Sequence, residues 1–342
     1  MGSKPVAIGA KVRAMSTNSR YGITIPFGGL PLAEHRDAFR ELVDLGYSDV
    51  WSSEADGADG FTPLALAAAW APELRLGVAI IPAFTRGPAV LAQSVASLAD
   101  AAPGRFVMGI GSSSNVIVER WNGIEFDEPY HRTRDSVRFL KAALTGEKVT
   151  EEYRTFSVKG FRLGIRPAQE PPILVAALRE GMLRMAGTEG DGAIINWLSA
   201  DDVGVVSPIV HAAAEAAGKG TPEVAARIFV CPSDDAETVR AQAKFAIAAY
   251  LNVPVYAEFH RWMGRGEQLR GMWDNWKAGD RKAALASIPD SVVDELIVHG
   301  SPEACRDHIS RYVDAGVDTP ALAVMPFAGV DVRQAVRDLA PR

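Results

Sequence analysis

The chain has 342 residues, 48% of them apolar and 23% charged, which is typical of a globular protein with a sizeable core and excludes a disordered or collagen-like chain. It carries 36 Lys and Arg residues against 42 Asp and Glu residues, a net charge of −6 without a basic cluster, so we expect no nucleic-acid partner. Because Cys231 and Cys305 are far apart and no apolar run has the length of a signal peptide or a membrane span, we expect a cytoplasmic protein with no membrane partner and no disulfide framework.

Short β-branched runs alternate with segments of helical periodicity along most of the chain. Helices are predicted, for example, over 33–45, over 63–70 and from Pro88 onward, where a proline suits the first helical turn. The predicted strands are 22–26, 49–54, 76–82, 105–112, 173–178, 192–198, 225–232 and 321–326. Because these strands are almost continuously apolar, we expect them to be buried on both faces, as parallel strands covered by helices are.

An alternation of eight strands with helices favours an α/β protein with a (β/α)₈ TIM barrel. The alternative is a doubly wound open sheet, but no G-x-G-x-x-G follows the first strand, so the dinucleotide fingerprint of that fold is missing. We therefore predict a single barrel domain over 1–342.

Two segments break the alternation and are predicted as insertions after strands four and seven. Segment 147–171 contains EEYRTFSVKGFRL, whose alternation predicts a hairpin. Segment 250–290 holds Trp262, Trp273 and Trp276, and it is too long for a plain loop and too aromatic for a linker. We expect this second insertion to be helical and able to cover the mouth of the barrel.

In a (β/α)₈ barrel the catalytic groups lie at the C-terminal ends of the strands. No lysine ends a predicted strand here, which argues against a Schiff-base aldolase. Only His131 and His260 of the six histidines are expected near the mouth, which argues against a metal site. A mouth with small residues, aromatic side chains and few ionisable groups suits a large planar cofactor better than acid/base chemistry by protein groups alone.

Two loops have the residue types that such a cofactor needs. After strand four, Gly109 and Gly111 permit close backbone approach, and the three serines 112–114 supply hydroxyl groups. After strand five, segment 179–183 begins a helix, whose free amide groups favour an anion such as a cofactor phosphate.

Five segments carry a family resemblance through their order and spacing. They are LGVAIIPAFTRGPAVLAQ, GRFVMGIGSS, NGIEFDEPYHRTRDSVRFLKAALTGE, PPILVAALREGMLRMAGTEGDGAIINWL and HGSPEACRDHISRYVDAGVD. Together they resemble the bacterial luciferase-like superfamily, and within it the actinobacterial oxidoreductases that use the deazaflavin coenzyme F420. The resemblance extends from about Gly22 to Pro326. Because FMN-dependent members share the barrel, FMN is the alternative cofactor.

The resemblance implies a cofactor site built from the loops at several strand ends. The residues implied to bind the cofactor are Val78, Ala79, Gly111, Ser112, Ser113, Ser114, Asn115, Arg179, Gly181, Met182 and Asn196. In the family, a cis peptide bond between non-proline residues supports the back face of the deazaflavin, and it would join Val78 to Ala79 here. From the residues alone, both would be ordinary barrel core. Arg184 is either a further phosphate ligand or a solvated helix charge.

Glu54, His131 and Asn196 are the candidate catalytic residues. Glu54 follows strand two, where the family places an acidic residue close to the ring, and its alternative role is that of a solvated loop carboxylate. His131 can titrate near neutrality beside a bound ring, unless it is a helix-start histidine satisfied by the backbone. Asn196 can hold a water that delivers a proton. The sugar-phosphate dehydrogenases of the family have a histidine and a glutamate where this chain has Ala55 and Ser114, which argues against glucose-6-phosphate oxidation.

The resemblance implies hydride transfer between reduced F420 and a small-molecule substrate, while the protein delivers one proton. Apolar residues expected at the mouth favour an apolar carbonyl or enone substrate; they are Phe84, Trp197, Trp262 and Trp273. The alternatives are an FMN-dependent luciferase-like monooxygenase and a barrel that binds a cofactor without turning it over. A cofactor-free phosphosugar isomerase is disfavoured because no Lys/His/Glu set ends the strands. Relatives commonly pair, so we expect a homodimer.

Overall fold

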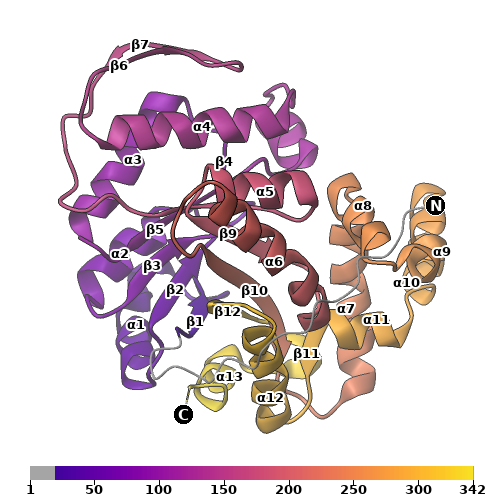
Figure 1. Ribbon diagram of the computed structural model, residues 1–342. Helices are drawn as coiled ribbons and strands as arrows, with labels where there is room; N and C mark the ends of the chain where they lie inside the picture. The colour runs from indigo at the N-terminus through magenta and orange to yellow at the C-terminus, as the bar shows by residue number, and fades with distance from the viewer. Residues whose placement is uncertain (1–19, 342) are drawn as a thin grey trace.

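The structure, a computed structural model that describes residues 20–341, has a closed barrel of parallel strands at its centre (Figure 1). The barrel strands, each hydrogen-bonded to the next and the last to the first, are β1 (Gly22–Thr24), β2 (Asp49–Ser52), β3 (Arg75–Val78), β5 (Phe106–Gly111), β8 (Ile173–Ala176), β9 (Gly192–Asn196), β10 (Glu223–Cys231) and β12 (Thr319–Val324). The predicted (β/α)₈ barrel is confirmed, and the doubly wound sheet is wrong.

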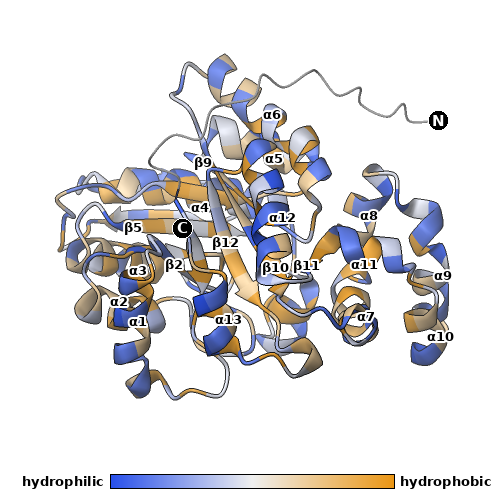
Figure 2. Cartoon of the chain, turned by 90° about the horizontal axis from the view of Figure 1, so that it is seen from below, coloured by the Kyte–Doolittle hydropathy of each residue, from blue (hydrophilic) through white to orange (hydrophobic). Residues whose placement is uncertain are grey.

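Helices between the strands form the outer layer of the barrel (Figure 1). They are α1 (His35–Asp44), α2 (Thr62–Trp70), α3 (Pro88–Ala101), α4 (Pro129–Leu144), α5 (Glu180–Thr188), α6 (Ala200–Ala216), α7 (Ala236–Leu251) and α12 (Pro302–Asp314). Local sequence sets several starts: Pro88 and Pro129 each occupy the first helical position, and Ser199 and Asp202 form a reciprocal capping box at α6. Figure 2 shows the outer helices alternating between hydrophilic and hydrophobic segments around the more apolar strands. No helix within residues 20–341 is both long and apolar enough to cross a membrane.

A small apolar cluster fills the interior of the barrel. Its buried members are Trp51, Val107, Leu174, Ile194, Ala225 and Ala321, which come from six different strands. Gly77 makes room for the largest of them, because a Cβ at this position would lie 2.3 Å from Cε3 of Trp51. The site described below therefore has a packed floor.

The third strand is interrupted where a single strand over 76–82 was predicted. β3 ends at Val78, and the chain resumes as β4 (Ile81–Pro82), which pairs with the end of β5. A cis peptide bond joins Ala79 to Ile80 in the break. The prediction placed this bond between Val78 and Ala79, so it is corrected by one residue: Val78 still belongs to the regular ladder with β2, and the backbone departs from it only afterwards.

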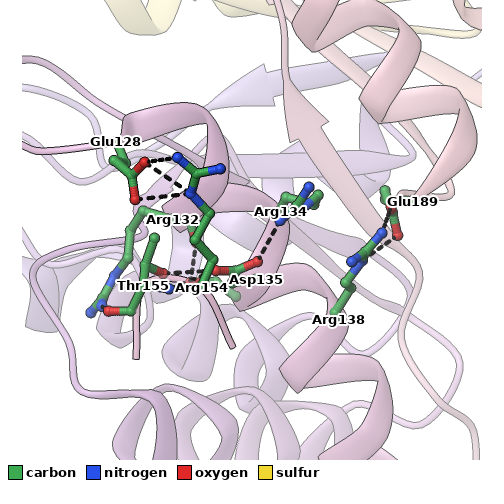
Figure 3. A network of polar contacts seen from close by, with 9 residues as sticks. Glu128, Arg132, Arg134, Asp135, Arg138, Arg154, Thr155 and Glu189 are labelled. Atoms are coloured by element: carbon green, nitrogen blue, oxygen red, sulfur yellow. Dashed lines mark hydrogen bonds and ion pairs between the residues drawn. The ribbon is translucent and has the colours of Figure 1, made fainter. Parts of the chain in front are cut away.

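Segment 147–171 contains the predicted hairpin, with β6 (Val149–Glu152) antiparallel to β7 (Ser157–Phe161). Polar contacts fasten its turn to α4 (Figure 3). One carboxylate oxygen of Asp135 accepts hydrogen bonds from the backbone amide and the hydroxyl of Thr155, at 2.9 and 3.0 Å. Arg132 donates to the carbonyl of Ala83 at 3.1 Å and lies 4.9 Å from the ring centre of Phe156. The hairpin thus holds the start of α4 beside the barrel.

Segment 250–290 is helical, as predicted, and lies beside α7 outside the barrel (Figure 1). Its helices are α8 (Pro254–Trp262), α9 (Gly266–Lys277) and α10 (Arg281–Ala286), followed by α11 (Asp290–Leu296). Buried Arg265 ties the segment to the barrel helix α6 through an ion pair with Asp202 and to α11 through one with Glu295, both at 2.8 Å. A short strand that was not predicted, β11 (Ile297–His299), then pairs with the end of β10. The remaining short elements are η1 (Leu32–Glu34), η2 (Val116–Trp121), η3 (Phe327–Gly329) and α13 (Val332–Asp338).

Candidate functional site

A cavity of about 1020 Å³ opens at the C-terminal ends of the strands. Its wall is formed by the loops that follow β2, β3, β5 and β8, by side chains of β9 and β10, and by α8. A much smaller cavity of about 10 Å³, large enough for one water molecule, lies next to it. Ala79, Ile194 and Arg227 line both spaces. The large cavity occupies the position at which barrel enzymes place their chemistry.

The break in the third strand forms an apolar part of the wall. Ala79 and Ile80 line the cavity, and the amide of Ala79 is held by the carbonyl of Ser52 at 2.7 Å. Val78, also predicted to contact the cofactor, is fully buried and does not line the cavity. Ala79 and Ile80 therefore give this part of the wall a small apolar surface.

The loop after β5 contributes hydroxyl groups. Ser112, Ser113 and Ser114 line the cavity, and Ser113 has a φ of 63°, in the left-handed region. Gly111 lies behind them: a Cβ there would be 2.7 Å from the Cβ of Ala176, so the close packing of β5 on β8 needs a glycine. Asn115 precedes η2 and is not part of the cavity wall.

The N-terminus of α5 opens into the cavity. Arg179, Gly181 and Met182 line it, and the amides of this first turn have no partner within the helix. Arg179 is exposed and forms no ion pair with any described residue, so it is available to an anion at the rim. Arg184 instead pairs with Glu180 at 2.7 Å on the helix surface. Free amides, the helix dipole and a guanidinium group together favour a phosphate here.

Glu54 lines the cavity, but its carboxylate is already engaged. Oε1 forms an ion pair with Arg86, and Oε2 accepts a hydrogen bond from the amide of Gly60 at 3.0 Å. The hydroxyl of Thr85 lies 3.4 Å from Oε1. This arrangement holds two loops together and leaves little of the carboxylate free for acid/base work.

Asn196, at the end of β9, lies near the floor of the cavity. Its amide nitrogen donates to the hydroxyl of Tyr256 at 3.2 Å, whereas its amide oxygen is buried and no described residue donates a hydrogen bond to it. The next residue, Trp197, has a φ of 54°, which is unusual for a bulky residue. Burial raises the pKa of Tyr256 to about 12, so its hydroxyl keeps its proton at neutral pH. Asn196 and Tyr256 thus present a polar pair to whatever occupies the cavity.

The two histidines expected near the mouth are placed differently. His131 does not line the cavity, whereas its neighbours Pro129 and Tyr130 do, and its buried Nδ1 has no hydrogen-bond partner within the described part of the chain. His260 is fully buried on the core side of α8. Burial and the nearby charge of Arg265 lower the pKa of His260 to about 3, so this ring is neutral at physiological pH. Neither imidazole is brought to the cavity surface.

Of the four apolar residues expected at the mouth, only Trp262 lines the cavity. Trp197 is buried and stacks on Phe229 at 4.0 Å between ring centres. Trp273 donates its indole N–H to the carbonyl of Leu251 at 2.9 Å, and Phe84 packs among the core residues.

Sequence reasoning missed two polar residues at the floor, Arg227 and Tyr256. Arg227 carried a usable signal, because an arginine interrupts the otherwise apolar strand AARIFVC. Tyr256 carried none, since it depends on how α8 docks.

The lining fits a flat heterocycle that carries an anionic tail. The apolar surface at Ala79 and Ile80 suits a ring face, the serine hydroxyls suit its polar edge or side chain, and the start of α5 suits a phosphate. Within residues 20–341, no group of three His, Cys, Asp or Glu side chains is arranged to hold a metal ion.

Comparisons with known proteins agree with this fit. A family model described as luciferase-like monooxygenase matches residues 8–319. The 5,10-methylenetetrahydromethanopterin reductase of Methanolobus tindarius is 27% identical over 281 residues, which is 80% of this chain and 84% of that protein. The F420-dependent glucose-6-phosphate dehydrogenase of Kineococcus radiotolerans is 31% identical over 292 residues, 80% of this chain and 81% of that protein. The solved structure of the coenzyme F420-dependent tetrahydromethanopterin reductase of Methanopyrus kandleri has a TM-score of 0.78 at 20% identity, covering 95% of this chain and 98% of that one.

Proposed function

The chain belongs to the luciferase-like monooxygenase family, and we propose that it is an oxidoreductase that uses coenzyme F420 to transfer a hydride to or from a small carbonyl or enone substrate. The proposal rests on one observation. The apolar Ala79–Ile80 surface, the serine loop and the start of α5 all line the same cavity. When bound there, the deazaflavin supplies two-electron hydride chemistry. The side chains of this protein then have to hold it, orient the substrate and move a proton.

The cofactor contacts are assigned from the cavity wall. Ala79 and Ile80 would support one ring face, Ser112 to Ser114 would bind the polar edge, and the amides of Gly181 and Met182 would bind the phosphate. Arg179 adds a positive charge at the rim. Val78, Gly111 and Asn115 were expected to bind the cofactor but do not line the cavity, so we propose that they shape these loops from behind.

The substrate side of the cavity has an apolar character. Ile194, Val253, Val255 and Trp262 line it, which favours a largely apolar body for the substrate. Ser114 faces the cavity where the family's sugar-phosphate dehydrogenases carry a glutamate, so we do not extend glucose-6-phosphate oxidation from the relatives to this chain.

The proton is best supplied by the pair of Asn196 and Tyr256. The phenol of Tyr256 keeps its proton at neutral pH because burial raises its pKa to about 12, yet it remains more acidic than an aliphatic alcohol. It can therefore protonate an alkoxide or enolate oxygen that forms beside it. Asn196, whose amide bonds the phenol oxygen at 3.2 Å, would position it. Glu54 and His131 are less suited, since one is ion-paired and the other does not reach the cavity.

Separate titrations of the purified protein with F420 and with FMN test this function, with binding followed by the fluorescence of each ligand. We expect F420 to bind at micromolar concentration, and reduced F420 to be oxidised anaerobically by at least one member of a panel of enones and ketones. Binding of FMN without F420 would favour the flavin monooxygenase instead. Binding of F420 without turnover across the panel would favour a barrel that only carries the cofactor.

A further inference from the structure

Arg227 projects into the barrel from the middle of β10. Its strand neighbours Ala226 and Ile228 pack outward against the helices, whereas Ala225 belongs to the apolar floor cluster. The side chain of Arg227 lines both the large cavity and the small one next to it. A guanidinium group therefore lies directly above a packed apolar floor.

No carboxylate among the described residues pairs with Arg227, although the cavity contains other charges. Glu54 is engaged by Arg86, and Glu258 is engaged by Arg261. The hydroxyls of Tyr250 and Tyr256 lie close to the Arg227 guanidinium, and its Nε is buried without an acceptor among residues 20–341. Burial lowers the pKa of Arg227, but a guanidinium stays charged in proteins. An unpaired buried charge destabilises a fold unless a ligand compensates for it.

The surroundings hold this charge in place for a ligand. Its guanidinium carbon lies 5.1 Å from the ring centre of Phe229, and Trp197 stacks on the same ring at 4.0 Å between ring centres. The register of the sheet places Arg227 directly beside Asn196 on β9. An anionic group bound by Arg227 would therefore lie within a few atoms of the substrate oxygen that we expect Tyr256, positioned by Asn196, to protonate.

The position of β10 favours the substrate over the cofactor as the source of this anion. Around the barrel, β10 follows β3 by four steps, through β5, β8 and β9, so it stands on the wall opposite the Ala79–Ile80 surface. A molecule between the ring and β10 would meet Arg227. The cofactor phosphate has its own proposed site at the rim, at the start of α5.

From this geometry we propose that Arg227 binds a carboxylate of the substrate, which makes the substrate an oxo acid or an unsaturated acid with an otherwise apolar body. The inference rests on the proposed function for the identity of the reaction. The binding step itself depends only on the cavity, because the planar guanidinium fork matches a carboxylate in two parallel hydrogen bonds.

Cinnamate and cinnamamide are matched probes for this step, since they share an apolar body and an unsaturated bond and differ only in the charged group. Calorimetry with the full-length protein, with and without oxidised F420, measures the affinity of each. We expect cinnamate to bind wild-type protein about tenfold or more tightly than cinnamamide. Arg227→Met should abolish that preference, and Arg227→Lys should keep part of it. Arg270→Met, which removes an exposed guanidinium paired with Glu267, is the control and should behave as wild type.

Thermal unfolding provides an independent readout. Without ligand, Arg227→Met should unfold at a temperature no lower than that of wild type, because it removes an unpaired buried charge. Cinnamate should raise the Tm of wild type only.

Equal binding of the two probes to wild type, binding of neither at millimolar concentration, or failure of Arg227→Met to fold would each overturn the inference. The inference would also be overturned if Arg227→Met lost F420 binding but still preferred cinnamate to cinnamamide. If F420 fails to bind wild type while cinnamate is preferred, the proposed function fails and the carboxylate site stands.

Discussion

Glu54 and Arg86 form an ion pair at the rim of the cavity, with side chains only 16% and 19% exposed. The other oxygen of Glu54 accepts the amide of Gly60, and Arg86 lies 5.1 Å from the ring centre of Phe61. These contacts join the loop after β2 to the chain that follows β4. The carboxylate thereby braces the wall next to Ala79, the surface on which the proposed ring would rest.

A Glu54→Gln variant tests whether this carboxylate braces the wall or donates a proton. We expect it to lower the free energy of unfolding by about 2 kcal/mol, since a largely buried charge-assisted hydrogen bond is lost. We expect kcat to change by less than about tenfold, against the loss of about 10²–10⁴ that removal of a general acid causes. Urea unfolding and anaerobic turnover of reduced F420 measure the two effects. Arg86→Gln should reproduce both, and the double variant should cost little more than either single one. A large loss of kcat in Glu54→Gln alone would return Glu54 to the role of acid.

Tyr256→Phe removes the proposed proton donor without changing the shape of the cavity. We expect kcat to fall by about 10²–10⁴ while the affinity for F420 stays within experimental error. Single-turnover oxidation of bound reduced F420 separates this chemical step from product release. The matched control is Tyr130→Phe, which removes a hydroxyl from the same cavity wall and leaves Asn196 and Arg227 untouched. Equal losses in the two variants would contradict the assignment.

Much of the fold could be predicted because its strands are short, apolar and bounded by turn residues. Ile173 to Ala176 and Gly192 to Asn196 are buried on both sides, and that leaves a continuous apolar run in the sequence. β11 could not be predicted, since Ile297–His299 follows α11 without a break and is a strand only because it pairs with β10. The position of the cis bond depends on where the ladder to β2 ends, which is set by tertiary register.

The site was less predictable than the fold. Residues at strand ends, such as Glu54, Ser112 and Asn196, reach the cavity because barrel topology places them there. Residues on the helical insertion do not follow from topology: in the run EFHRWM, Trp262 lines the cavity, whereas His260 points into the core. The ion pair that joins this insertion to α6, between Arg265 and Asp202, links positions that no local pattern relates.

A Gly109→Ala variant tests how closely the third and fourth strands of the barrel, β3 and β5, must approach each other. A Cβ at this position would lie 1.9 Å from the carbonyl oxygen of Val78 and 2.5 Å from Cδ1 of Ile194. Because a backbone atom cannot move aside cheaply, we expect Gly109→Ala to lower the free energy of unfolding by about 3 kcal/mol or more. Gly204→Ala, in α6 with nothing within 4 Å, is the control and should raise stability by up to about 1 kcal/mol. Denaturant unfolding measures both. A Gly109→Ala protein as stable as wild type would mean that the strands can separate.

His260 should make the stability of the protein depend on pH. Its pKa is lowered to about 3 in the folded protein by burial and by Arg265, whereas an unfolded histidine has a pKa of about 6.5. Between these values the unfolded chain binds a proton that the folded protein does not, so the free energy of unfolding falls as the pH drops below about 6.5. The slope from this residue approaches about 1.4 kcal/mol per pH unit and ends near pH 3.

Urea unfolding of wild type and His260→Leu at a series of pH values measures this slope as a growing difference between the two stability curves. His308, whose pKa burial also lowers, affects both proteins equally and cancels in that difference. Parallel curves would show that His260 can be protonated inside the fold, and hence that α8 opens to water more readily than its packing implies.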